Sequence, residues 1–175
     1  MPSARIMGTG SYAPAKVLTN AELEKLVNTS DEWIRTRTGI SERRMTTEAE
    51  ATSDLAYQAA LRALAAAGLD PADLDMILVA TVTPDMFFPS TACVLQDRLG
   101  ARRAGAMDIS AACSGFVYGL AVADGLLRLG PLRNILLVGA ETLTKIVNWR
   151  DRNTCVLFGD GAGAVVLRAC EGERG

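Results

Sequence analysis

Two continuous apolar runs constrain the fold of this chain more than any other feature of its sequence. Residues 76–82 read MILVATV and residues 134–140 read NILLVGA. Runs of this length without polar alternation are typical of strands buried on both faces of a sheet. Between them we expect helices over 91–99 and 113–129 and a short strand over 105–110. Helices that alternate with buried strands predict a layered α/β fold with a largely parallel sheet.

Local signals at helix ends support this interpretation. Thr19 and Glu22 have the spacing of a capping box, at the start of a helix that we expect to end near Val27. Ser30 can cap a second helix over 31–37, which Gly39 would end. The other elements that we expect are a strand over 5–12, a helix over 54–67 capped by Ser53, and strands over 155–158 and 162–167.

The composition excludes several classes of function. Hydrophobic residues make up 49% of the 175 residues, and the net charge is −2, from 18 basic and 20 acidic side chains. This balance argues against nucleic acid or an anionic membrane as the main partner. The first ten residues lack the apolar core of a secretion signal, and the longest apolar run, 115–123, is far short of the roughly 20 residues that span a bilayer. We therefore expect a soluble cytoplasmic protein, in which the weakly charged 113–129 helix is buried on nearly all sides.

Cysteine and histidine limit the chemistry further. The four cysteines, at positions 93, 113, 155 and 170, form no CxxC pair, so we expect neither a metal site nor disulfides. The chain contains no histidine, which is the commonest general base near neutral pH. An enzyme that uses a nucleophile from this chain would need another base, or a histidine from outside these 175 residues.

Cys113 has the sequence context of a nucleophile. Residues 107–116 read MDISAACSGF, where a strand ends, small residues turn the chain and a helix begins. Unpaired N–H groups and the helix dipole at such a position favour the thiolate, and the N–H groups can stabilise an oxyanion. The alternative is a small core cysteine at a tightly packed helix start. Residues alone leave both interpretations open, whereas the other three cysteines have the context of core or terminal residues.

Aromatic residues give two further candidates. Trp33 and Arg37 lie four residues apart and so share a face of a helix, where indole and guanidinium can stack on a base and bind phosphate. The alternative is a surface contact without a ligand. Phe87 and Phe88 follow a buried strand and would line an apolar pocket or fill the core. The glycine-rich segment 158–164 precedes a strand, so it predicts a sharp turn and no dinucleotide or P-loop site.

Together these segments resemble β-ketoacyl-[acyl-carrier-protein] synthase III, the condensing enzyme that initiates type II fatty acid synthesis. The resemblance runs along nearly the whole chain. It is carried by the order and spacing of five pieces, which are TSDEWI at 29–34, RTGI at 37–40, FPS at 88–90, DISAACSGF at 108–116, and DR at 151–152 leading into FGDGAG at 158–163. The resemblance implies a thiolase-like fold in αβαβα layers, in which residues 1–175 form the N-terminal half that carries the nucleophile.

The resemblance also implies roles for individual residues. Cys113 would accept an acetyl or other short acyl group from CoA, and malonyl-acyl-carrier protein would then lose CO₂ and attack the acyl-cysteine. Trp33 and Arg152 would sandwich the CoA adenine, Arg37 would hold a CoA phosphate, and Thr29 would lie along the same entrance. Phe88 would approach the acyl pocket of the partner subunit in a homodimer. No cofactor beyond the CoA thioester substrate and no metal is implied.

The histidine and asparagine of this family belong to the C-terminal half, so we expect that half to be absent from this chain. Three uses of the fold remain open from the sequence. The first is part of the initiating synthase. The second is a related enzyme, such as a polyketide starter-unit synthase, an acyltransferase or a 3-hydroxy-3-methylglutaryl-CoA synthase. The third is a non-catalytic half that binds CoA or a partner chain.

Overall fold

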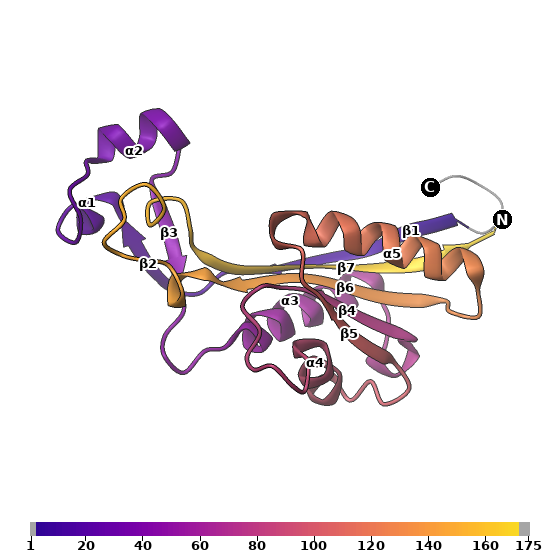
Figure 1. Cartoon of the computed structure of the whole chain (residues 1–175). Coiled ribbons are helices and arrows are strands. Elements are labelled where there is room, and N and C mark those ends of the chain that lie inside the picture. Colours follow the sequence, from indigo (N-terminus) through magenta and orange to yellow (C-terminus); the bar gives the residue numbers. More distant parts are fainter. Residues whose placement is uncertain (1–2, 172–175) are drawn as a thin grey trace.

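A five-stranded sheet between two helical layers forms the body of the molecule (Figure 1). The computed structural model describes residues 3–171. The strand order is β1-β7-β6-β4-β5, in which β4 runs parallel to β5 and β6, and β7 runs antiparallel to β1 and β6. The sheet is therefore mixed, with its parallel part at the β5 edge. Its strands are β1 (Ser3–Tyr12), β4 (Met76–Ala80), β5 (Gly105–Ile109), β6 (Asn134–Thr142) and β7 (Asp160–Cys170).

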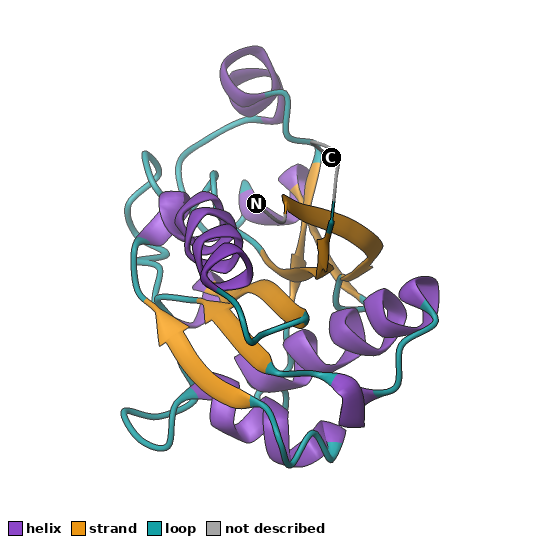
Figure 2. Ribbon diagram, turned by 90° about the vertical axis from the view of Figure 1, so that its right-hand side faces the viewer, coloured by secondary structure: helices purple, strands orange, loops and turns teal. Residues whose placement is uncertain are grey.

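Three helices cover the two faces of this sheet (Figures 1 and 2). Helices α3 (Thr52–Ala67) and α4 (Thr91–Leu99) pack on one face, and α5 (Gly115–Leu129) packs on the other. Each face has its own apolar core, because the alternating side chains of β4 and β6 point to opposite sides: Ile77 and Leu136 lie toward α3 and α4, and Leu78 and Leu137 lie toward α5. We call these strands and helices the sheet region.

A smaller unit lies beyond one end of the sheet (Figure 1). Strands β2 (Lys16–Thr19) and β3 (Glu42–Met45) form an antiparallel pair, joined by α1 (Asn20–Leu23) and α2 (Asp31–Thr38). The segment 146–159 packs against this pair, and a third apolar core, which includes Leu23, Ile34 and Cys155, lies between them. We call these four elements and the segment 146–159 the hairpin region. Short 3-10 turns complete the chain at Pro71–Asp73, Ala112–Ser114 and Leu143–Lys145.

Most elements expected from the sequence are confirmed. The capping box forms, since Glu22 accepts from the Thr19 N–H at 2.8 Å, although α1 ends at Leu23. Gly39 ends α2 in the left-handed conformation, with φ of 73°. The cap expected at Ser53 is wrong: α3 begins at Thr52, and the Asp54 carboxylate accepts from the Ala51 N–H at 2.7 Å.

The strand expected over 155–158 is wrong. Cys155 N–H donates to the Asp151 carbonyl and Leu157 N–H donates to that of Thr154, so the chain forms successive turns there. The Val156 carbonyl accepts from the Arg43 guanidinium at 3.2 Å. The backbone groups of this apolar run thus form hydrogen bonds within turns and with one side chain. An apolar run alone does not distinguish such turns from a strand.

Helix α5 is far more exposed than the sequence led us to expect. Only 22% of the stretch Ala112–Leu129 is buried. Its outward face exposes 63% of Val117, 56% of Tyr118 and 89% of Leu129, because the sheet covers one side and no described residue covers the other. In the described part of the chain this is the one helical stretch long and apolar enough to cross a membrane, by length and composition alone.

Candidate active site

Cys113 lies in a tight turn between β5 and α5. The Ser114 N–H donates to the Ala111 carbonyl at 3.1 Å, and Ala112 has a φ of 47°, a left-handed conformation that costs a non-glycine residue energy. Cys113 itself is exposed. The α-helix begins at Gly115, two residues later than expected, because the intervening residues form a 3-10 turn. The sharp turn presents the thiol at the surface and excludes the alternative of a core cysteine.

Small residues allow α5 to lie close to the sheet below this turn. A Cβ atom on Gly115 would lie 3.1 Å from the Cβ of Ala80, and one on Gly119 would lie 2.5 Å from Cδ1 of Leu137. These contacts are closer than side-chain packing normally permits. The position of Cys113 is therefore fixed by backbone packing of α5 on β4 and β6.

The chemistry available at Cys113 follows from its place at the carboxyl ends of three parallel strands. The Thr81 N–H donates to the Ile109 carbonyl at 3.2 Å, which extends the β4–β5 ladder almost to the turn. The Cys113 N–H donates to no other group in the described part of the chain. A thiol with a free N–H on the same residue can attack an acyl carbon and donate to the oxyanion that forms.

A partly buried carboxylate beside these strand ends was not predicted from the sequence. Glu141 accepts from the Val82 N–H at 2.9 Å and from the Thr83 hydroxyl at 2.5 Å. The Thr83 hydroxyl lies 2.9 Å from the Thr142 N–H, and Thr52 joins the network through the Thr83 carbonyl at 2.5 Å. The network ties the ends of β4 and β6 to α3. The sequence signal for this network was the pair of threonines, Thr81 and Thr83, directly after the buried strand.

Phe88 lies on an exposed loop that a second carboxylate holds. Asp108, on β5, accepts from the Thr91 and Ala92 N–H groups at 2.8 Å each, and so caps α4 and fixes the loop before it. Phe87 is fully exposed and Phe88 is 85% exposed. The aromatic pair therefore does not fill the core of this chain, which leaves the pocket or interface interpretation.

Trp33 and Arg37 share a face of α2, as their spacing predicted, and Arg152 joins them, as the family resemblance implied. Within α2, the Arg37 guanidinium carbon lies 4.5 Å from the Trp33 ring centroid, and that of Arg152 lies 4.6 Å from the same centroid. Arg152 also donates to the Asn28 carbonyl at 3.2 Å, next to Thr29. The Thr29 hydroxyl is buried without a hydrogen-bond partner. We call Trp33, Arg37 and Arg152 the arginine–indole clamp.

The spacing within the clamp has a consequence for ligands. A base stacked between the indole and a guanidinium needs two stacking distances, each about 3.5–4 Å for carbon atoms in contact. The present distance of 4.6 Å between the Arg152 guanidinium and the Trp33 ring accommodates only one such stacking distance. An adenine that enters between them must therefore displace the Arg152 guanidinium from the ring.

Two buried polar residues hold the hairpin region in place, and neither role was predicted from the sequence. Arg43 is 5% exposed and donates to the Leu18 carbonyl and to the Asn20 side-chain oxygen. Burial lowers the pKa of its guanidinium, although an arginine remains charged. Asp160, at the start of β7, accepts from the N–H and hydroxyl groups of both Thr46 and Thr144, at 2.6–2.9 Å. It joins β3 to the sheet region.

Figure 1 shows how the two candidate sites lie relative to each other. The end of the sheet at which α5 begins, directly after the turn that contains Cys113, faces the hairpin region. No hydrogen bond, ion pair or cation–π contact joins Cys113 to the clamp in residues 3–171. Of the other cysteines, Cys155 is fully buried and Cys93 and Cys170 are half-buried, and the described residues contain no group of side chains suited to a metal ion.

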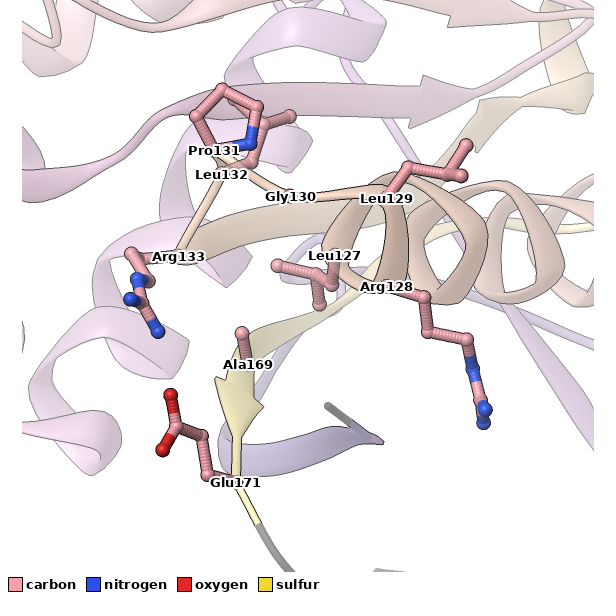
Figure 3. A pocket seen from close by; sticks show the side chains of 9 residues that line it. All are labelled: Leu127, Arg128, Leu129, Gly130, Pro131, Leu132, Arg133, Ala169 and Glu171. Atoms are coloured by element: carbon pink, nitrogen blue, oxygen red, sulfur yellow. The ribbon is translucent and has the colours of Figure 1, made fainter. Parts of the chain in front are cut away.

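A hollow of about 430 Å³ at the opposite end of α5 is not part of this site (Figure 3). It lies at the last turn of a 15-residue helix, about 22 Å along the axis from the end that carries Cys113. Arg128 at its edge is paired with Asp124 at 2.6 Å. Its walls are the loop 129–133, Leu127, Arg128 and the residues at the end of β7, and no nucleophilic side chain lines it.

Comparisons with known proteins agree with these features. The family described as 3-Oxoacyl-[acyl-carrier-protein (ACP)] synthase III matches residues 107–175. The β-ketoacyl-[acyl-carrier-protein] synthase III of Caldanaerobacter subterraneus is 64% identical over 173 residues, which are 99% of this chain and 52% of that protein. The protein of the same name from Xylella fastidiosa is 64% identical over 168 residues, which are 96% of this chain and 52% of that protein.

Solved structures give the same result. The 3-oxoacyl-[acyl-carrier-protein] synthase III of Aquifex aeolicus superposes with a TM-score of 0.94 and 56% identity, over 97% of this chain and 55% of that one. The priming β-ketosynthase of the R1128 polyketide pathway has a TM-score of 0.94 and 38% identity, over 97% of this chain and 51% of that one. The thiolase-like α/β fold expected from the sequence is confirmed. By sequence and fold the chain is similar, over nearly its whole length, to proteins of the β-ketoacyl-[acyl-carrier-protein] synthase III family, and it spans about half the length of the curated relatives that it matches.

Proposed function

We propose that this chain is the nucleophile-bearing half of an initiating condensing enzyme of type II fatty acid synthesis. The observation that carries the proposal is the exposed Cys113, with its free N–H, at the carboxyl ends of β4, β5 and β6. The 64% identity to proteins named for this activity supports it. The substrates are a short acyl-CoA, such as acetyl-CoA, and malonyl-acyl-carrier protein, with no cofactor beyond the CoA thioester.

In the first step, the Cys113 sulfur attacks the thioester carbon of acetyl-CoA. The carbonyl oxygen becomes an oxyanion, to which the Cys113 N–H donates, and collapse of this intermediate releases CoA and leaves the acyl-cysteine. The clamp binds the distant end of CoA: adenine stacks on Trp33 with Arg152 on its other side, and Arg37 binds a phosphate. Thr29, whose buried hydroxyl has no partner, lies at the same entrance.

In the second step, malonyl-acyl-carrier protein loses CO₂ and its new carbanion attacks the acyl-cysteine carbon. A carbon–carbon bond forms and the Cys113 thiolate leaves. This chain contains no histidine. The groups that stabilise the carbanion therefore belong, in this proposal, to the part of the protein that its relatives have beyond the length matched here.

The active form in this proposal is a cytoplasmic homodimer. Met107 lies on β5, an edge strand of the sheet, and its side chain is 38% exposed. The exposed Phe87 and Phe88 belong to the loop that Asp108 fixes beside this strand. An edge strand next to two exposed aromatic side chains is suited to an interface, in which Phe88 reaches the acyl pocket of the partner subunit.

The test is an acceptor assay on the full-length protein. After acetyl-CoA treatment, malonyl-acyl-carrier protein should yield 3-oxobutanoyl-acyl-carrier protein with release of one CO₂ per condensation. Malonyl-CoA and acetoacetyl-CoA serve as alternative acceptors. Formation of 3-hydroxy-3-methylglutaryl-CoA, or transfer of the acyl group without CO₂ release, would overturn the proposal.

A second candidate is a polyketide starter-unit synthase, because the R1128 priming enzyme superposes as well as the Aquifex enzyme does. Sequence identity favours the fatty acid enzyme, because it is 56% with the Aquifex enzyme and 38% with the R1128 enzyme. The two differ in which carrier protein they accept, so carrier proteins of both types belong in the same assay. The third candidate, a non-catalytic CoA-binding half, predicts that iodoacetamide labels Cys113 no faster than Cys93.

A further inference from the structure

The hairpin region contains a second ligand-sized hollow, to which the clamp does not contribute. Its volume is about 440 Å³, within the range of small-molecule sites. Three segments meet there: the paired strands β2 and β3, the turn after α1, and the segment 146–159. Its lining residues are Lys16, Leu18, Leu26, Met45, Trp149 and Arg150.

The walls of this hollow are apolar, and part of them faces solvent. Leu18 is buried in the hairpin core, against which Met45 and Trp149 pack. The Trp149 ring N–H donates to the Thr144 carbonyl at 3.2 Å, which fixes the indole. Leu26 is 61% exposed. An alkyl chain laid along these side chains would remove their apolar surface, and its own, from water.

The charges around the hollow are all positive. Lys16 and Arg150 make no side-chain hydrogen bond or ion pair with any described residue, and no carboxylate lines the hollow. Glu22 is close enough for Lys16 to contribute to the lowering of its pKa, but the main cause is its hydrogen bonds with Thr19. Its carboxylate is therefore already engaged.

We propose that this hollow binds a medium-chain fatty acid in its carboxylate form. The alkyl chain lies on Leu26, Met45 and Trp149, and the carboxylate lies between Lys16 and Arg150. A carboxylate loses water contacts readily only where a cation replaces them, and here two cations border an apolar surface. An amphiphile with a cationic head would meet charges of its own sign. The site shares no residue with the clamp or with Cys113, so it stands independently of the proposed function.

Decanoate is the probe, titrated into the full-length protein by calorimetry and by tryptophan fluorescence. We expect saturable binding of one decanoate per chain, both without CoA and with acetyl-CoA at saturation. The double variant Lys16→Gln/Arg150→Gln should weaken binding about tenfold, since each partly exposed charge pair contributes up to about 1 kcal/mol, or fivefold. Leu26→Asn should weaken it by a similar factor through lost apolar contact.

Matched controls separate this site from others. Lys25→Gln removes a neighbouring exposed charge that does not line the hollow, and should bind decanoate as the wild type does. Decyltrimethylammonium, with an equal chain and a positive head, should not bind. Decanoate binding that acetyl-CoA abolishes and that the Lys16/Arg150 double variant leaves unchanged would overturn the proposal. Loss of acetyl-CoA binding in an Arg37 variant would concern the clamp alone.

Discussion

The sheet region and the hairpin region hold their candidate residues in different ways. Cys113 is positioned by backbone geometry: a strained residue before it, a 3-10 turn, and glycines that seat α5 on the sheet. The clamp is positioned by side chains from two segments that lie more than a hundred residues apart in sequence, with Trp33 on α2 and Arg152 in a turn. Cys113 is thus fixed by the backbone before any ligand arrives, whereas the clamp must open to admit a stacked base.

This difference suits the two tasks that we propose. Covalent chemistry needs the sulfur and the oxyanion donor in one place, and a site that does not reorganise during the reaction. Ligand binding tolerates movement, because Arg152 makes one hydrogen bond, to the Asn28 carbonyl, and can leave the Trp33 ring at modest cost. Substitutions in the two regions should therefore affect different kinetic constants.

Replacement of the nucleophile should have the largest effect. In the full-length protein, Cys113→Ser should lower the rate of acyl-enzyme formation at least about a thousandfold, because an alcohol ionises far less readily than a thiol. Intact-protein mass spectrometry after acetyl-CoA treatment measures this. Cys93→Ser, at a half-buried cysteine of α4 on the other face of the sheet, should acylate normally. A mass increase of one acetyl group on the Cys113→Ser protein would remove Cys113 from the first step.

A change in the clamp should act on binding. Arg37→Ala should raise the KM for acetyl-CoA about 10- to 100-fold and lower kcat less, since a charge-assisted hydrogen bond contributes about 1.5–3 kcal/mol in both ground and transition states. Arg35→Ala is the control, because Arg35 lies on the same helix and is weakly paired with Asp31 at 4.0 Å. An unchanged KM in the Arg37 variant would exclude that residue from the CoA site.

The sequence predicted the sheet region better than the hairpin region, and the reason is physical. Buried strands such as 76–80 and helices with glycine ends such as 91–99 are specified by local patterns, which the structure reproduces. The strands β2 and β3 were missed. Each is four residues long, and β3 reads ERRM, which has no apolar pattern. The stability of β3 comes instead from the buried Arg43 and from Asp160, which is distant in sequence. No local pattern encodes such contacts.

The candidate site shows the same division. Small residues around Cys113 and the i, i+4 spacing of Trp33 and Arg37 could be read from the sequence, and the structure places them as that reading required. Glu141 and Asp108 were missed, because each acts on backbone N–H groups of a distant element. The exposure of α5 was also missed, since an apolar helix gives no sign of which surface covers it.

Two glycines on α5 test the claim that backbone packing fixes the nucleophile. Gly119→Ala should destabilise the protein by about 1–3 kcal/mol, because the new Cβ would lie 2.5 Å from Cδ1 of the fully buried Leu137. Gly125→Ala, on the same helix with no atom within 4 Å of its new Cβ, should stabilise it by about 0.5–1 kcal/mol. Urea unfolding measures both changes. Equal effects would mean that α5 has room to move, and that Cys113 is less rigidly placed than we infer.

The hairpin region should show the smallest effect, as a dependence of stability on pH. Burial, with a contribution from Asp151, raises the pKa of the Cys155 thiol above its ordinary value of 9.0, against a lowering effect of Arg43. Below pH 9 the thiol is neutral in both states, so its contribution to stability is fully present. As pH rises further, the unfolded thiol ionises first, and that contribution is lost as pH rises through the folded-state pKa.

Cys155→Ala should therefore flatten the decline in unfolding free energy above pH 9, by at most about 1.4 kcal/mol per pH unit. The comparison is of slopes, measured by urea unfolding from pH 7 to pH 10.5, because the cavity left by the smaller side chain lowers stability at every pH. If the two slopes coincide, the Cys155 thiol has access to water. The core beneath the clamp would then be looser than its burial implies, and movement of Arg152 would involve the whole segment 146–159 instead of one side chain.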